Sequence, residues 1–300
     1  MEEKQTMTNE QLESQLKSLR VKATITMLLT YAAVVGIIIM WFFMDNLVLG
    51  LVFLVIAMVF AYFSSKSSST LKKLLSDNII SSVLKEALGD SVEYNPWGKL
   101  NPGSMAFPFD YNKVEGSDHI KAVYNGLNIE LSDIELINET ETVDADGNTE
   151  KNSITNFKGQ WLICDFGKEL SGEVRLSAND KKLRKQHKND SVEMENETFN
   201  NRFLVTANDA QEAYYILTPH MMEYILSMAD KSGGEVYMSF QRDGKLHVAV
   251  KTGRDFFELG KSNANVEGLR QKFLGELRWF TDMIDTLRVE DTLYKKETNV

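Results

Sequence analysis

Two apolar segments near the amino terminus constrain this chain more than any other feature. Residues 23–44 and 47–63 contain no ionised side chain, and only Asp45 and Asn46 separate them as clearly polar residues. A helix of about 20 residues crosses the roughly 30 Å hydrocarbon core of a bilayer, and a shorter one can span if its flanks adjust. The sequence therefore predicts a transmembrane helical hairpin over residues 23–63, with its turn at the membrane surface.

The charges beside the hairpin predict its orientation. Cations occur close to both outer ends and none occurs in the turn; they are Lys17, Arg20, Lys22, Lys66, Lys72 and Lys73. The more positive side of a membrane helix normally stays in the cytoplasm, so both termini are expected to be cytoplasmic. The predicted location is the bacterial inner (plasma) membrane, with the first helix as an uncleaved anchor because a second span follows at once.

Small residues at every fourth position indicate how the two helices could pack. Ala32 and Gly36 form one such pair, and Ala57 and Ala61 form the other. This spacing lets two membrane helices approach each other closely.

The rest of the chain is acidic and contains one cysteine. The net charge of the 300 residues is −10. Nucleic-acid binding needs a basic surface that displaces counterions from phosphates, so the composition argues against this class of partner. Cys164 alone excludes an internal disulfide and a zinc site built from several thiolates.

Changes in pattern divide the chain into six parts. They are a cytoplasmic amphipathic arm (1–22), the transmembrane hairpin (23–63), a stalk helix (64–89), an ordered linker (90–118), a cytoplasmic α+β domain (119–290) and a tail (291–300). The linker contains Pro and Gly and forms no long regular element, but its apolar residues, Trp97, Met105, Phe107 and Phe109, make it too apolar for a free tether.

Alternating apolar residues predict six or seven strands in the domain. The expected strands cover residues 120–124, 129–136, 154–166, 173–176, 199–206, 236–240 and 246–250, with turns at Asn125-Gly126, Asp146-Gly147 and Asp243-Gly244. Helices are predicted to begin at Asp209 and Thr218, and a long helix is predicted over residues 265–288. This order predicts an α+β fold with an antiparallel sheet, and a PH-like barrel is the alternative.

A cluster of cations stands out in this acidic domain. It consists of Lys181, Lys182, Arg184, Lys185 and Lys188, with His187 among them. One interpretation is a solvated loop between strands. The other is contact with anionic lipid headgroups, which attract Lys and Arg by about 1 kcal/mol per residue near the surface.

Other candidate sites have weaker patterns. The segment 144–150 is acidic, but its glycine stands at the fourth position where a calcium loop of the EF-hand type needs it at the sixth, so a hairpin turn is favoured. Cys164 alternates with apolar residues and is interpreted as a buried structural thiol. His247 is interpreted as a surface residue on its strand.

Several ordered motifs make residues 110–260 resemble a known family. They are Phe157-Lys-Gly159, Asp165-Phe166, Phe199-Asn-Asn-Arg-Phe203, Asp209-Ala-Gln-Glu212-Ala213-Tyr-Tyr215-Ile-Leu-Thr218-Pro219, Val236-Tyr-Met-Ser-Phe240 and Phe256-Phe-Glu258. The chain resembles a bacterial membrane-anchored family catalogued as domain of unknown function 3137. The resemblance implies a membrane segment pair before the domain, and it implies no reaction, cofactor or catalytic residue.

The sequence therefore favours a membrane-anchored interaction or scaffold domain. Its expected partners are membrane-associated proteins, a second copy of the chain, or anionic lipid headgroups. The alternatives are a membrane-tethered enzyme using Asp165, Glu169 or His220 as acid or base groups, and an auxiliary subunit of a transporter or protease. No motif pairs those three residues, and no metal-binding, cofactor-binding or catalytic residue is assigned.

Overall fold

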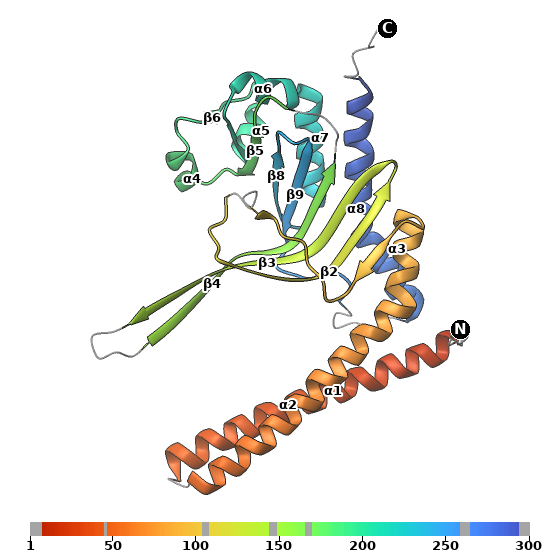
Figure 1. Ribbon diagram of the computed structural model, residues 1–300, viewed down its shortest axis with the longest axis vertical. Helices are drawn as coiled ribbons and strands as arrows, with labels where there is room; N and C mark the ends of the chain where they lie inside the picture. Colours follow the sequence, from red (N-terminus) through yellow and green to blue (C-terminus); the bar gives the residue numbers. More distant parts are fainter. Residues whose placement is uncertain are drawn as a thin grey trace. The chain divides into compact units, whose positions relative to one another are not determined.

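The computed structural model describes residues 8–44, 47–103, 108–143, 149–165, 170–258 and 265–293 (Figure 1). The chain divides into two compact units. One comprises Met1–Ser82 and Leu259–Gln271, and the other comprises Val83–Glu258 and Lys272–Val300. The first contains the apolar helices and the second contains a large sheet.

Two long helices dominate the first unit. Helix α1 (Asn9–Ile38) begins with a capping box between Thr8 and Gln11, and it continues through a π-helical turn, η1 (Ile39–Phe43). Helix α2 (Leu47–Leu75) continues through η2 (Ser76–Ile80) into α3 (Ser81–Leu88). Both helices are long and apolar enough to cross a membrane, as the sequence predicts. Asp45 and Asn46, the predicted turn, lie outside the described residues.

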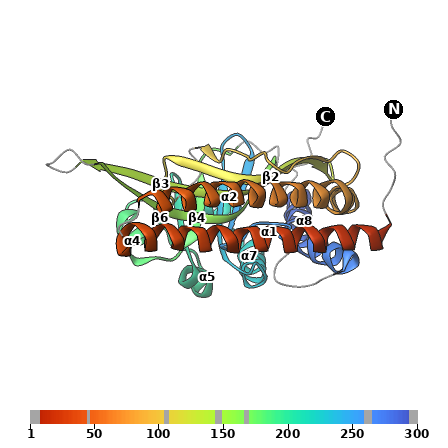
Figure 2. The ribbon, with the colours of Figure 1, turned by 90° about the horizontal axis from the view of Figure 1, so that it is seen from below.

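Small residues bring α1 and α2 together, although not at every predicted position. Ala33 and Ala57 are buried, whereas Ala32 and Ala61 are exposed. A Cβ atom at Gly50 would lie 1.7 Å from Nε1 of Trp41. The glycine thus leaves room for an aromatic ring from the other helix, and the two helices run side by side in Figures 1 and 2.

A nine-stranded antiparallel sheet forms the centre of the second unit, in the order β1-β2-β3-β4-β9-β8-β5-β7-β6. Its strands are β1 (Glu93–Asn95), β2 (Lys113–Tyr124), β3 (Leu127–Val143), β4 (Thr149–Asp165), β5 (Val174–Ala178), β6 (Ser191–Val192), β7 (Phe203–Ala207), β8 (Glu235–Phe240) and β9 (Lys245–Lys251). Within the described residues β1 and β6 are edge strands. The α+β prediction is therefore confirmed, and the PH-like barrel is wrong because the sheet does not close on itself.

The predicted hairpin turns agree with the structure wherever it describes them. Tyr124 pairs with Leu127 across Asn125-Gly126, and both turn residues have positive φ angles, 49° and 83°, as a two-residue type I′ turn requires. Gly244, between β8 and β9, has a φ of 80°. The Asp146-Gly147 turn lies outside the described residues.

The remaining helices are α4 (Lys181–Gln186), α5 (Glu197–Arg202), α6 (Ala210–Ile216), α7 (Pro219–Lys231) and α8 (Val266–Leu293). Asp209 and Thr218 cap α6 and α7 as predicted. The strand predicted over residues 199–206 is wrong in its first half. The Asn196 side chain accepts a hydrogen bond from the Phe199 backbone N–H and starts α5 there, so β7 begins only at Phe203.

Helices α7 and α8 pack against one face of the sheet, called the helix face here. The indole N–H of Trp279 in α8 donates to the Met228 carbonyl in α7 at 3.1 Å, and the Tyr124 hydroxyl in β2 donates to Asp285 at 2.9 Å. One stripe of α8 is apolar and buried; its members within this unit are Phe273, Leu277, Phe280, Ile284 and Leu287. This stripe is thus covered inside its own domain.

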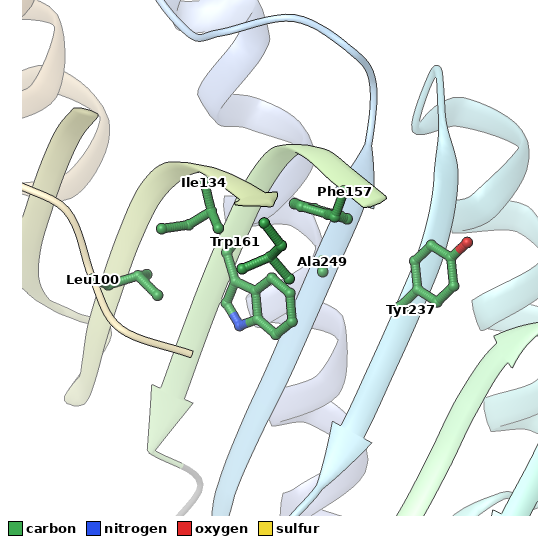
Figure 3. Packing of buried hydrophobic residues seen from close by; sticks show 7 residues of the cluster. Leu100, Ile134, Phe157, Trp161, Tyr237 and Ala249 are labelled. Atoms are coloured by element: carbon green, nitrogen blue, oxygen red, sulfur yellow. The ribbon is translucent and has the colours of Figure 1, made fainter. Parts of the chain in front are cut away.

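The segment between β1 and β2 covers the opposite face, called the linker face here. A buried cluster on this face contains Leu100 from the segment together with Phe157 and Trp161 of β4 (Figure 3). The ring of Phe109 lies 5.0 Å from that of Phe157. Trp97, however, is 59% exposed, and Met105 and Phe107 lie outside the described residues.

Candidate functional site

The predicted cation cluster lies on and just after α4. Asp180 begins this helix because its side chain accepts hydrogen bonds from the backbone N–H groups of Lys182 and Leu183, at 2.7 and 3.2 Å. The segment is therefore a short helix followed by a turn, rather than a loop throughout. The five predicted cations are all exposed: Lys181, Lys182, Arg184, Lys185 and Lys188.

The charges of this cluster are largely available to a partner. Arg184 donates to the Asn179 side chain at 3.1 Å, which fixes its position without neutralising its charge. None of the four lysines forms an ion pair in the part of the chain that the structure describes. The five cations therefore form one concentrated positive surface on an acidic domain, which suits an anionic partner.

A second polar cluster is buried, and no pattern in the sequence indicated it. Asp133 in β3 is only 2% exposed. One carboxylate oxygen accepts from the Gln160 side chain at 3.0 Å, and the other accepts from the Phe256 backbone N–H at 2.7 Å. Burial raises the pKa of Asp133 well above its ordinary value, with a further contribution from nearby Asp118.

Asp118 in β2 belongs to the same cluster. It is 3% exposed and has a φ of 56°, at an irregularity in the β2–β3 pairing between Ser117 and Ile120. Its carboxylate accepts from the Ser117 hydroxyl at 2.6 Å and from the hydroxyl of Tyr94 in β1. The two aspartates thus connect β1, β2, β3 and the segment after β9. We interpret this cluster as structural, because its carboxylates are occupied by the chain's own donors.

His247 is not the surface residue that the sequence suggested. It is 6% exposed on the linker face, and its Nδ1 atom accepts from the indole N–H of Trp161 at 3.3 Å. Burial lowers its pKa to about 4, although the charge of Asp243 acts in the opposite direction. The imidazole is therefore neutral in the folded protein at neutral pH and part of the core packing.

The other predicted residues have varied positions. Cys164 is fully buried, and burial raises the pKa of its thiol to about 12, which agrees with a structural thiol. Among the proposed acid or base groups, Asp165 is half-buried at the end of β4, His220 is exposed at the start of α7, and Glu169 lies outside the described residues. No group of three His, Cys, Asp or Glu residues suited to a metal ion occurs among the described residues.

Comparison with known proteins finds one family model that matches part of the chain. Residues 155–289 match the family model described as "Protein of unknown function (DUF3137)", which confirms the resemblance found in the sequence. No curated protein matches the chain. Among solved structures, it is similar to the crystal structure of the mycobacterial trehalose monomycolate transport factor A, TtfA, with 10% sequence identity and a TM-score of 0.35, over 68% of this chain and 91% of that chain.

Proposed function

We propose that this chain, which carries the DUF3137 match, is an integral protein of a bacterial inner membrane that holds an α+β interaction domain at the cytoplasmic surface. The observation that carries the proposal is the exposed apolar surface of α1 and α2. Leu28 is 62% exposed, Phe42 81% and Val48 69%. Large contiguous apolar surfaces are unfavourable in water, whereas the hydrocarbon core of a bilayer covers them at no such cost.

The α4 cluster supports the interaction role of the domain. Five exposed cations on a chain with a net charge of −10 favour an anionic partner at this surface. Membrane-associated acidic protein segments and anionic lipid headgroups both have the required charge. A domain tethered to the bilayer would meet either of them at a high local concentration.

Cysteine labelling tests the proposed topology. Single cysteines are introduced at Glu10, Asn46 and Lys295 in a Cys164→Ala variant, and intact cells stripped of any outer membrane are treated with a membrane-impermeant thiol reagent. Only the cysteine at position 46 should react, because the positively charged flanks stay in the cytoplasm. The variant without an introduced cysteine is the control. Reaction at positions 10 and 295 instead would show that the protein has the opposite orientation in the membrane.

Lysine modification in lipid nanodiscs tests the lipid alternative. The full chain is placed at one copy per disc, in anionic or neutral lipid, and the modification of Lys181, Lys182, Lys185 and Lys188 by an amine reagent is measured by mass spectrometry. If these lysines contact headgroups, anionic lipid should protect them at low salt, and protection should fade as added salt shortens the screening length to about 8 Å or less. Equal modification in both lipids would reject lipid contact.

A further inference from the structure

A two-stranded ribbon extends from the sheet, and no third described strand pairs with it. We call residues 138–143 of β3 and 149–154 of β4 the acidic arm. The pairing of β2 with β3 ends at Ile137, and the pairing of β9 with β4 begins only at Gln160. Among its described residues the arm therefore has strand pairing only between its own two strands, and at its base the Asn112 side chain bonds the Glu139 backbone. Figure 1 shows the arm projecting beyond the rest of the sheet.

The side chains of the arm are mostly exposed and pack little against the rest of the domain. Every side chain described in it is exposed except that of Asn138, which is half-buried, and Ile154 is 55% exposed. A two-stranded ribbon is marginally stable in water by itself, and its unpaired edges readily accept a partner. The arm therefore has the properties of a docking element.

The charge of the arm limits the kind of partner. Its described residues include Glu139, Glu141 and Glu150 but only one cation, Lys151. Glu139 pairs with Lys113 at 2.8 Å and Glu141 with Lys151 at 3.5 Å. Both pairs are exposed, and such pairs contribute little free energy, so they can be exchanged for others. Two acidic arms would repel each other, and a basic partner is favoured.

The chain itself has the complementary surface, on α4. Within one molecule, no hydrogen bond or ion pair connects the arm to α4 among the described residues, and Figure 1 shows the two well apart. We propose that the acidic arm of one copy docks on α4 of a second copy, so that two copies exchange arms around a two-fold axis. This inference rests on the proposed function of α4 as an anion-binding surface.

A second copy provides a partner for the acidic arm and for the cations of α4 at the same time. A two-fold exchange forms the same arm–α4 contact twice per dimer, which doubles the contribution of one modest electrostatic surface. Copies anchored in one membrane also share a small volume, so a weak contact is sufficient for association. Lipid would satisfy α4 alone and would leave the acidic arm without a partner.

Disulfide cross-linking of the full chain in its native membrane tests the exchange. Neutral exposed positions are used, Asn152→Cys in one tagged copy and Gln186→Cys in a second copy with another tag, both in the Cys164→Ala background. Mild oxidation should link the two tags. The pair Asn152→Cys and Gln211→Cys, with the second cysteine on α6 in place of α4, is the matched control and should give at least about tenfold less product.

Charge reversal then decides whether the contact depends on these residues. Lys181→Glu, Lys182→Glu and Lys185→Glu together, in the copy that carries the α4 cysteine, should lower the cross-link yield about tenfold. Glu139→Lys, Glu141→Lys and Glu150→Lys together, in the copy that carries the arm cysteine, should restore it to within about twofold. An unchanged yield after the first reversal would overturn the exchange.

The nanodisc experiment separates this inference from the proposed function. In the reversed variant the readout is Lys188, which keeps its amine. If the reversal on α4 leaves cross-linking unchanged but removes the protection of Lys188 by anionic lipid, α4 is an anion-binding surface whose partner is lipid, and the exchange is wrong. If it changes neither cross-linking nor the protection of Lys188, the exchange is wrong and contact of α4 with lipid is wrong as well. Loss and rescue of cross-linking support the exchange.

Discussion

Replacement of Phe273 by alanine is expected to destabilise the sheet domain by about 3–5 kcal/mol, a large part of the roughly 5–15 kcal/mol that stabilises a typical domain. Phe273 is fully buried in α8, and its ring lies 5.2 Å from that of Phe257 in an edge-to-face arrangement. The truncation would remove this contact and leave a cavity that the packed surroundings fill only in part.

Urea unfolding of the full chain in detergent micelles, followed by near-ultraviolet circular dichroism, measures this effect. Arg278→Ala is the matched control because Arg278 is exposed on the same helix, and its replacement should change the free energy of unfolding by no more than about 0.5 kcal/mol. A Phe273→Ala protein that unfolds like the parent would show that the stripe of α8 does not stabilise the domain. A stability that depends steeply on protein concentration would indicate an intersubunit helix instead.

Acidification is expected to weaken the fold through His247. Its pKa is about 4 in the folded protein against an ordinary value of 6.5, because burial disfavours the charged imidazolium. The neutral imidazole therefore contributes stability that is fully present above pH 6.5 and is lost as the pH falls toward 4. This difference between the two pKa values corresponds to about 3 kcal/mol in the free energy of unfolding.

His247→Gln should remove this dependence, because the amide does not titrate and its oxygen can still accept from the Trp161 indole. The comparison with the parent is needed because Asp133 contributes a pH dependence of stability with the opposite sign. Its raised pKa gives stability that is present below its ordinary value of 3.8 and is lost as the pH rises through the folded value. Between pH 7 and 4 the parent should lose about 3 kcal/mol more than the variant. Equal losses would contradict the role assigned to His247.

Patterns within single segments were sufficient for much of this fold. The apolar runs predicted both long helices, and the Asn125-Gly126 turn predicted the first long hairpin. The capping residues Asp209 and Thr218 predicted where α6 and α7 begin. These features depend on hydrophobic length, backbone dihedral preference and local hydrogen bonds, and neighbouring residues in the sequence decide all three.

Contacts between distant segments decided the rest. The alternation of β9 assigned His247 to the face opposite Val248, but only the packing of the linker face buries it beside Trp161, which is 86 positions away. Asp133 likewise acquires its partners from positions 160 and 256. The α4 cluster was visible as a run of cations, whereas the isolation of the acidic arm emerged only from strand pairing.

The sequence by itself determined which segments are apolar, helical or extended, because those properties are local. The tertiary structure decided which polar groups are buried and which strands are left without neighbours, because burial and pairing depend on residues far apart in the chain.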